Sequence, residues 1–214
     1  LSYARSKDML NWETVEGKPI TLPITYDTKG VIVDPIPIDS GFFGGSIGFD
    51  SKNRPVILSI KFDENGMTQA YNARFEKGKW KIYQTSDWNY RWYFHGFGAI
   101  EMKIGLSPVV LTKDGYLTQG FGHWEHGSGT WILDEKTLKP TGTIEMTQWP
   151  EELIVKEDHT GLMQINWKKD AGESGYPNLE YVLRWETLPP NRDRQRQESP
   201  KPSTLRIYGL RYGS

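Results

Sequence analysis

Two short segments of the chain gather the residue types best suited to acid–base chemistry. One is SDWNYRWYFHGFG at residues 86–98, and the other is GHWEHGSG at residues 122–129. A neutral imidazole is well matched to take a proton near pH 7, and a phenol can return one. A guanidinium binds a carboxylate through two parallel hydrogen bonds. The candidate catalytic residues are His123, His95, Tyr90 and Arg91.

Each of these segments also has a purely structural interpretation. Large aromatic side chains usually serve burial, which favours Trp88 and Trp92 as packing residues between neighbouring sheets. Arg91 lies between two aromatic residues and could stack on them or pair with Asp87 instead of binding a ligand. His95 precedes Gly-Phe-Gly, where the backbone can approach a ligand closely. Both interpretations stay open for Arg91.

Two other kinds of site fit part of the same residue set. His95, His123 and His126 could bind zinc, but the chain has no cysteine and only Glu125 as a helper carboxylate, so acid–base work is favoured. Glu101 and Glu125 could form the carboxylate pair of a glycoside hydrolase, but the sequence does not fix their separation. We predict no metal site and no cofactor, with a structural calcium ion left open.

The composition narrows the class of protein. The chain has 26 basic and 27 acidic residues, so it predicts no nucleic-acid or membrane partner. The apolar stretches are strand-sized, and the absence of cysteine excludes disulfides and thiol nucleophiles. The N-terminal residues do not form a signal-peptide pattern and resemble the middle of a domain. Aromatic residues make up 13% of the chain and accompany 22 Gly and 13 Pro, which indicates short strands and long loops, or aromatic rings exposed to stack on sugars.

Short β-patterned segments recur between turn signals, and almost nothing follows a helical period. The clearest set has strands at 46–50, 55–63, 67–76 and 80–86, separated by the turns SKNR, ENG and KGK. Such repeated meanders predict an all-β protein, a β-propeller of four-stranded antiparallel blades, with a sandwich or a long twisted meander as alternatives. A single, partial propeller of about three and a half blades would span residues 1–214. The predicted units are a half blade at 1–17 and blades at about 42–88, 98–149 and 152–212.

The propeller topology places the two chemical segments on one face. If the strands of a blade are lettered A to D outward from the channel, the D-to-A connections and the B-to-C loops share a face. Residues 87–105 are predicted to be an enlarged D-to-A connection, and residues 125–129 a B-to-C loop. Long loops on a rigid scaffold often carry function. The residues expected on this face are His95, His123, His126, Tyr90, Arg91, Trp92, Trp124 and Tyr176.

One turn motif supports the propeller. The stretch SKDMLNW, from Ser6 to Trp12, resembles the Asp-box of sialidase-type propellers, Ser-x-Asp-x-Gly-x-x-Trp, with Leu10 in place of the usual glycine. In that motif the aspartate binds the amides of the turn, and the tryptophan fills the space between neighbouring sheets. The resemblance implies a structural role on the face opposite the active site.

The wider chain resembles the BNR-repeat family of bacterial polysaccharide-degrading propellers, which includes ulvan lyases and related uronate-polysaccharide lyases. The resemblance is carried by YARSKDMLNWE, DWNYRW, GTWILDEKTLKP and YVLRWETLPPNRDR. Members of the family have more blades than this chain. The resemblance therefore implies the C-terminal half of a propeller of about seven blades, with the missing N-terminal blades as a partner.

The resemblance also implies a function. It predicts a secreted or periplasmic polysaccharide lyase that cleaves a uronic-acid-containing polysaccharide by β-elimination. Arg91 would neutralise the uronate carboxylate, His123 or alternatively His95 would take the proton, and Tyr90 or again His95 would protonate the leaving oxygen. The substrate-binding residues would be Trp124, His126, Tyr176 and Trp92.

Two other functions stay open. A sialidase-like glycoside hydrolase would need a tyrosine nucleophile and several arginines, and Arg91 is the only arginine placed on the predicted face. A non-catalytic carbohydrate-binding propeller would keep Trp124 and Arg91 and would tolerate loss of every histidine. A protein-interaction propeller is the least favoured, because its face need not be rich in histidine and tryptophan.

Overall fold

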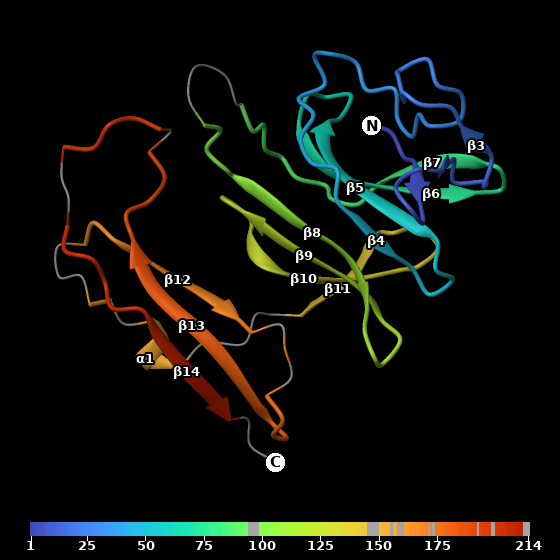
Figure 1. Cartoon of the computed structure of the whole chain (residues 1–214). Coiled ribbons are helices and arrows are strands. Elements are labelled where there is room, and N and C mark those ends of the chain that lie inside the picture. Colours follow the sequence, from blue (N-terminus) through green and yellow to red (C-terminus); the bar gives the residue numbers. More distant parts are fainter. Residues whose placement is uncertain are drawn as a thin grey trace. The chain divides into compact units, whose positions relative to one another are not determined.

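The computed structural model (Figure 1) describes residues 1–93, 99–144, 150–154, 156–157, 161–170, 172, 174–191, 193–197 and 200–211. These residues form four antiparallel sheets and one helical turn, so the predicted all-β class is confirmed. The chain divides into two compact units. The first comprises Leu1–His95 with Met102–Met146, and the second comprises Gly96–Glu101 with Thr147–Ser214.

The first sheet is small and is built around the Asp-box turn. It contains the strands β1 (Arg5–Ser6), β2 (Trp12–Glu13) and β3 (Pro19–Ile20). Asp8 Oδ1 accepts hydrogen bonds from the backbone amides of Leu10 and Asn11 at 2.9 and 2.7 Å. These bonds, led by the one from the Asn11 amide, hold the pKa of the Asp8 carboxyl well below its usual range. The turn therefore has the structural role that its sequence predicts.

The second sheet matches its predicted strands to within two residues at every end. It runs in the order β4 (Ile47–Phe49), β5 (Pro55–Phe62), β6 (Thr68–Glu76) and β7 (Lys79–Gln84). In its hairpins, as in the Asp-box, an aspartate carboxylate accepts hydrogen bonds from backbone amides of the turn. Asp50 accepts from the amides of Lys52 and Arg54, and Asp63 accepts from the amide of Met67. Local hydrogen bonds to aspartate therefore set these turns.

The third sheet follows the same plan. It contains β8 (Ile104–Leu111), β9 (Leu117–His123), β10 (Gly127–Leu133) and β11 (Pro140–Ile144), paired in sequence order. β10 begins at Gly127, three residues earlier than the predicted loop 125–129 allows. The connection between β9 and β10 is consequently a tight hairpin over residues 124–126.

The second and third sheets pack against each other closest at their first strands. A Cβ atom on Gly48 of β4 would lie 2.1 Å from the backbone oxygen of Val109 on β8, so only glycine fits there. Outward from this contact the sheets enclose an apolar core that includes Trp88, Trp92 and Trp131. Close approach at the inner strands with aromatic filling farther out is the packing expected of neighbouring propeller blades.

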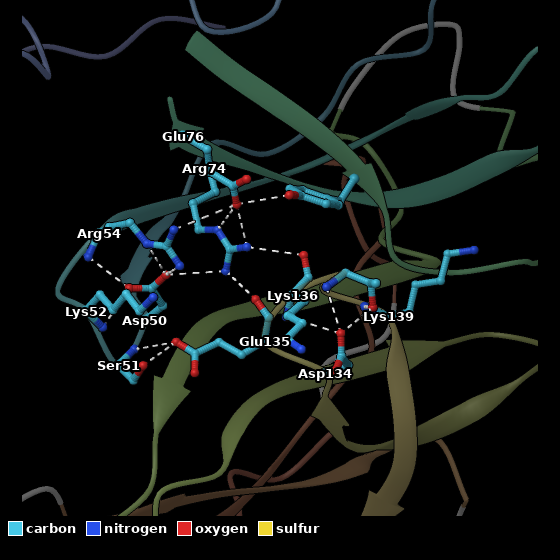
Figure 2. A network of polar contacts seen from close by, with 12 residues as sticks. Asp50, Ser51, Lys52, Arg54, Arg74, Glu76, Asp134, Glu135, Lys136 and Lys139 are labelled. Carbon is cyan, nitrogen blue, oxygen red and sulfur yellow. Dashed lines mark hydrogen bonds and ion pairs between the residues drawn. The ribbon is translucent and has the colours of Figure 1, made fainter. Parts of the chain in front are cut away.

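A polar network joins the same two sheets at the end where the β4–β5 and β10–β11 turns lie (Figure 2). The Arg74 guanidinium, 2% exposed, donates from Nη1 to the backbone oxygen of Glu135 at 2.6 Å and to Asp50 Oδ2 at 3.3 Å. Arg74 Nε also donates to Glu76 at 2.6 Å. Ser51 on one sheet completes the link by donating to the Glu135 carboxylate on the other. Arg74 therefore links the second sheet to the third.

The second unit contains a three-stranded sheet and the helical turn. The elements are α1 (Glu151–Ile154), β12 (Gln164–Lys169), β13 (Leu179–Thr187) and β14 (Arg206–Arg211). The stretch ELIVKED at 152–158 has the composition of a strand, but α1 occupies its start. Pro150 precedes the turn, and Glu151 and Glu152 place negative charge at the helix N-terminus, where it is stabilising. Leu153 is the buried anchor of this turn.

Candidate functional site

The aromatic segment after β7 stays extended along the start of β6. Odd-numbered residues from 87 to 93 are exposed, and even-numbered residues from 86 to 92 are buried or half-buried. The backbone amide of Thr68 donates to the backbone oxygen of Tyr90 at 2.7 Å, and the backbone amide of Trp92 donates to Thr68 Oγ1 at 2.7 Å. Successive side chains of an extended segment point to opposite sides. Tyr90 and Arg91 therefore face in opposite directions.

Gln69 fixes the middle of this segment. Its side-chain amide donates to the Trp88 oxygen at 2.8 Å, and its Oε1 accepts from the Trp88 amide at 2.9 Å. The Ser86 hydroxyl donates to the same Oε1 at 2.7 Å. Gln69 is 1% exposed, so these bonds lie in the interior, where leaving them unmade would be costly. The side chain of Gln69 takes the place of a backbone partner and sets the position of Trp88.

Four aromatic side chains come together at the end of β9. The His123 ring has its centroid 4.6 Å from that of Trp88, 4.8 Å from that of Tyr90 and 4.5 Å from that of His126. His126 also lies nearly parallel to Trp88, with centroids 6.5 Å apart and an interplanar angle of 17°. We call Trp88, Tyr90, His123 and His126 the histidine cluster. It brings together residues from the two segments that the sequence predicts to share a face.

His123 is buried, and its hydrogen bonds define its tautomer. Nδ1 accepts from the backbone amides of Glu125 and His126, each at 3.1 Å. The proton of the neutral ring therefore sits on Nε2, which is buried and has no hydrogen-bond partner among the described residues. Burial, together with the nearby His126, lowers the pKa of His123 to about 4.

The predicted role of His123 as the base stays a prediction. In this structure Nδ1 accepts two backbone amides and Nε2 carries the proton of the neutral ring, which favours a structural role. His123 holds the hairpin that carries Trp124 and His126. His126 itself is exposed, so its imidazole is the one in the cluster that solvent and a ligand can reach.

Trp124 sits at the tip of the same hairpin, 70% exposed. The ammonium group of Lys103 lies 3.8 Å from the centroid of its indole, and the Trp124 amide donates to the Lys103 oxygen at 2.9 Å. The pairing stabilises the indole and brings a positive charge next to the cluster. Sequence reasoning missed Lys103. Its place directly before β8, at the end of the enlarged connection, was the available signal.

Arg91 does not lie in the cluster, and its role as a carboxylate clamp stays a prediction. Its Nη1 donates to the Gly66 oxygen at 2.7 Å, and its guanidinium lies 4.0 Å from the ring centroid of Phe62. The ring of Tyr93 lies 5.6 Å away on the same exposed side of the segment. Stacking on aromatic rings, the structural interpretation, describes Arg91 correctly.

The other predicted site residues are placed as follows. Trp92 is 2% exposed and packs against Phe43 with ring centroids 5.4 Å apart, which favours the packing role over the predicted substrate-binding role. Tyr176 is 68% exposed and belongs to the second unit. His95 lies outside the described residues. Trp124, Tyr90, His123 and His126 are thus the predicted residues that the structure places together or in one hairpin.

The described residues contain neither a metal-ligand group nor a membrane-spanning helix. No group of three or more His, Asp or Glu side chains that could hold a metal ion occurs in the described ranges. Within the same part of the chain, no helix is long and apolar enough to cross a membrane.

Comparisons with known proteins agree with this architecture. Residues 1–88 match the model of a BNR repeat-containing family member. Two solved structures are similar to 94% of the chain, each with a TM-score of 0.50 and 13% sequence identity. One is a PL25 ulvan lyase from a new family of polysaccharide lyase, and the other is a PL25 ulvan lyase bound to -[GlcA(1-4)Rha3S]-. No curated protein matches the chain.

These similarities define the class of fold. The chain is an all-β protein of propeller type, and the predicted resemblance to the BNR-repeat family and to ulvan lyase is confirmed. The chain spans about 40% of the length of each ulvan lyase structure that it matches. The number of blades in the whole propeller and the division into blades and a half blade stay predictions.

Proposed function

We propose that the chain belongs to a carbohydrate-active propeller that cleaves a uronic-acid-containing polysaccharide by β-elimination. The observation that carries the proposal is the histidine cluster, in which an exposed imidazole and a phenol pack on the same buried His123 ring. The shared fold with polysaccharide lyases supports the substrate class, since one of those structures holds a sugar polymer segment containing GlcA. A secreted or periplasmic location fits such a substrate.

The cluster can supply the two proton transfers of an elimination. His126 takes the proton from the carbon next to the uronate carboxylate, the electron pair forms a carbon–carbon double bond, and the glycosidic bond breaks. Tyr90 donates its phenolic proton to the oxygen that leaves. Each transfer is worth about 10²- to 10⁴-fold in rate. The proton that His126 gains and the one that Tyr90 loses are exchanged with solvent before the next cycle.

The remaining residues hold the substrate and the catalytic groups. Lys103 offers a positive charge to the uronate carboxylate, which makes the neighbouring proton easier to remove. Trp124 presents an exposed indole on which a sugar ring stacks. His123 is a positioning residue, because its Nδ1 accepts the amides of the hairpin that carries His126. His95, in the connection that also carries Tyr90, stays a candidate for either proton transfer.

A non-catalytic carbohydrate-binding module is the second candidate. The observation that favours it is the engagement of two residues that a catalytic site would have used, Arg91 with Gly66 and His123 with its own hairpin. Such a module would need only Trp124 and Lys103 to hold a sugar. It differs from the lyase in one property, because it binds the polymer without changing it.

An ultraviolet assay separates these functions. The folded 214-residue chain is incubated with ulvan, glucuronan, pectic and glycosaminoglycan polymers while the absorbance of new carbon–carbon double bonds is recorded. Absorbance that rises with one polymer and falls about 100-fold or more in His126→Ala and Tyr90→Phe establishes the lyase. Tyr93→Phe is the matched control, because Tyr93 lies on the opposite, exposed side of the segment.

Three outcomes would overturn the proposal. Double bonds that form equally in His126→Ala and Tyr90→Phe would place the chemistry elsewhere in the chain. New reducing ends without absorbance would indicate a hydrolase. Polymer binding that wild type and both variants share, with no product from any of them, would establish the binding module.

A further inference from the structure

A cavity lies beside the histidine cluster in the first unit. It has a volume of about 550 Å³ and opens between the end of β7 and the β10–β11 hairpin. The residues that line it are Gln84, Thr85, Ser86, Asp87, Trp88, Trp131, Lys139 and Pro140, and Trp88 also belongs to the histidine cluster. The volume falls within the range of about 300–1,000 Å³ that small-molecule sites occupy. We call this cavity the interblade groove.

Two of the side chains that line the groove are charged and are not paired with any described residue. Asp87 and Lys139 are both exposed, and neither side chain makes a hydrogen bond or ion pair with a described residue. The carboxylate accepts hydrogen bonds and the ammonium donates them. The groove therefore offers one acceptor group and one positive charge to a bound molecule.

Two indoles, those of Trp88 and Trp131, line part of the groove. Trp88 and Trp131 pack with centroids 5.7 Å apart and are 7% and 6% exposed. Neither indole N–H has a hydrogen-bond partner in the described part of the chain, and neither is sealed from solvent. Indole edges, a carboxylate and an ammonium match a ligand that combines apolar ring surface with hydroxyl and carboxylate groups. A uronate sugar has all three features.

Trp88 connects the groove to the histidine cluster. The same indole that lines the groove lies 4.6 Å from the His123 centroid and stacks near His126. The cluster and the groove therefore share one side chain. We propose that the interblade groove is a second saccharide subsite, which binds a uronate carboxylate through Lys139 and sugar hydroxyls through Asp87. The ligand class rests on the proposed function, whereas the existence of a binding groove does not.

The proposal is tested by calorimetric titration of the full chain with a glucuronate-containing tetrasaccharide. Lys139→Ala and Asp87→Ala are each expected to weaken binding about fivefold, as loss of one partly exposed charged contact does. Lys136→Ala and Asn89→Ala are the matched controls, because they lie in the same turn and the same segment but do not line the groove. A neutral tetrasaccharide of glucose should bind Lys139→Ala and wild type equally. All four side chains are exposed, so the thermal unfolding midpoints should not change.

The outcomes separate the groove from the proposed reaction. If no polymer yields double bonds but Lys139→Ala and Asp87→Ala still weaken tetrasaccharide binding, the groove stands and the lyase fails. If the lyase is active and the tetrasaccharide dissociation constant and the KM for polymer are unchanged in both variants, the groove is not a subsite. Equal weakening in Lys136→Ala would reduce the effect to general surface charge and would also overturn the proposal.

Discussion

The imidazole of His123 links stability to pH. Its Nδ1 accepts two backbone amides only while the ring is neutral, and its surroundings lower its pKa to about 4 from the ordinary 6.5. The unfolded chain therefore binds the proton at higher pH than the folded chain does. Stability from this residue is complete above about pH 6.5 and is lost as the pH falls toward 4.

The variant His123→Asn tests this pH dependence, because its side-chain oxygen can accept hydrogen bonds from the same amides but does not titrate. Between pH 6.5 and 4 the free energy of unfolding of wild type should fall by up to about 3 kcal/mol more than that of the variant. Urea unfolding followed by tryptophan fluorescence at several pH values measures the difference. Parallel pH profiles for the two proteins would show that His123 does not titrate in this window.

At the residue scale, the sequence predicts which side chains come together better than it predicts what each of them does. The chemistry of Tyr90, His123 and His126 marks them as candidates, and the structure brings them together. Their roles depend on which nitrogen meets a backbone amide and on which side of an extended segment each residue lies. One signal was available: Asp87, Asn89 and Arg91 alternate with aromatic residues, and a period of two already separates Arg91 from Tyr90.

At the element scale the hairpins were predictable because their causes are local. Aspartate at the start of a turn, with glycine or asparagine inside it, fixes the strand ends of the second sheet to within two residues. The helical turn α1 was not predictable from its apolar residues, since ELIV fits a strand or a helix. Pro150 and the two glutamates favour the helix, and the burial of Leu153 accompanies it.

The packing of β4 on β8 depends on one glycine. Gly48→Ala would place a methyl group 2.1 Å from the Val109 oxygen, so the strands must separate. We expect a loss of about 2–3 kcal/mol in the free energy of unfolding, measured by thermal unfolding and urea titration. Gly105→Ala on β8 is the matched control, because its added methyl would meet no atom within 4 Å. A change below about 0.5 kcal/mol in Gly48→Ala would show that the two strands do not pack this closely.

At the scale of the whole molecule, buried polar links hold neighbouring sheets together. Arg74 reaches two carboxylates of its own sheet and a backbone oxygen of the next (Figure 2). Its removal takes the buried guanidinium away from both carboxylates, which leaves Asp50 with Arg54 and Glu76 with Tyr83 and Arg54. Side-chain chemistry alone did not predict this link, because the two sheets meet through residues 61 positions apart in the chain.

Arg74→Met should therefore lower the free energy of unfolding by about 3–5 kcal/mol. Lys52→Met, in the exposed turn of the same network, should change it by less than about 0.5 kcal/mol. Equilibrium urea unfolding at neutral pH compares the two variants. Equal effects would mean that the network adds nothing beyond surface charge.

The central claim is that the histidine cluster performs an elimination on a uronate polymer, and the masses of its products test this most directly. The folded chain is incubated with one defined glucuronate-containing oligosaccharide, and the fragments are weighed by mass spectrometry. Elimination predicts two fragments whose masses sum to that of the substrate, one of them unsaturated, and their loss in His126→Ala. Fragments that together exceed the substrate by one water, or unsaturated fragments undiminished in His126→Ala, would contradict the claim.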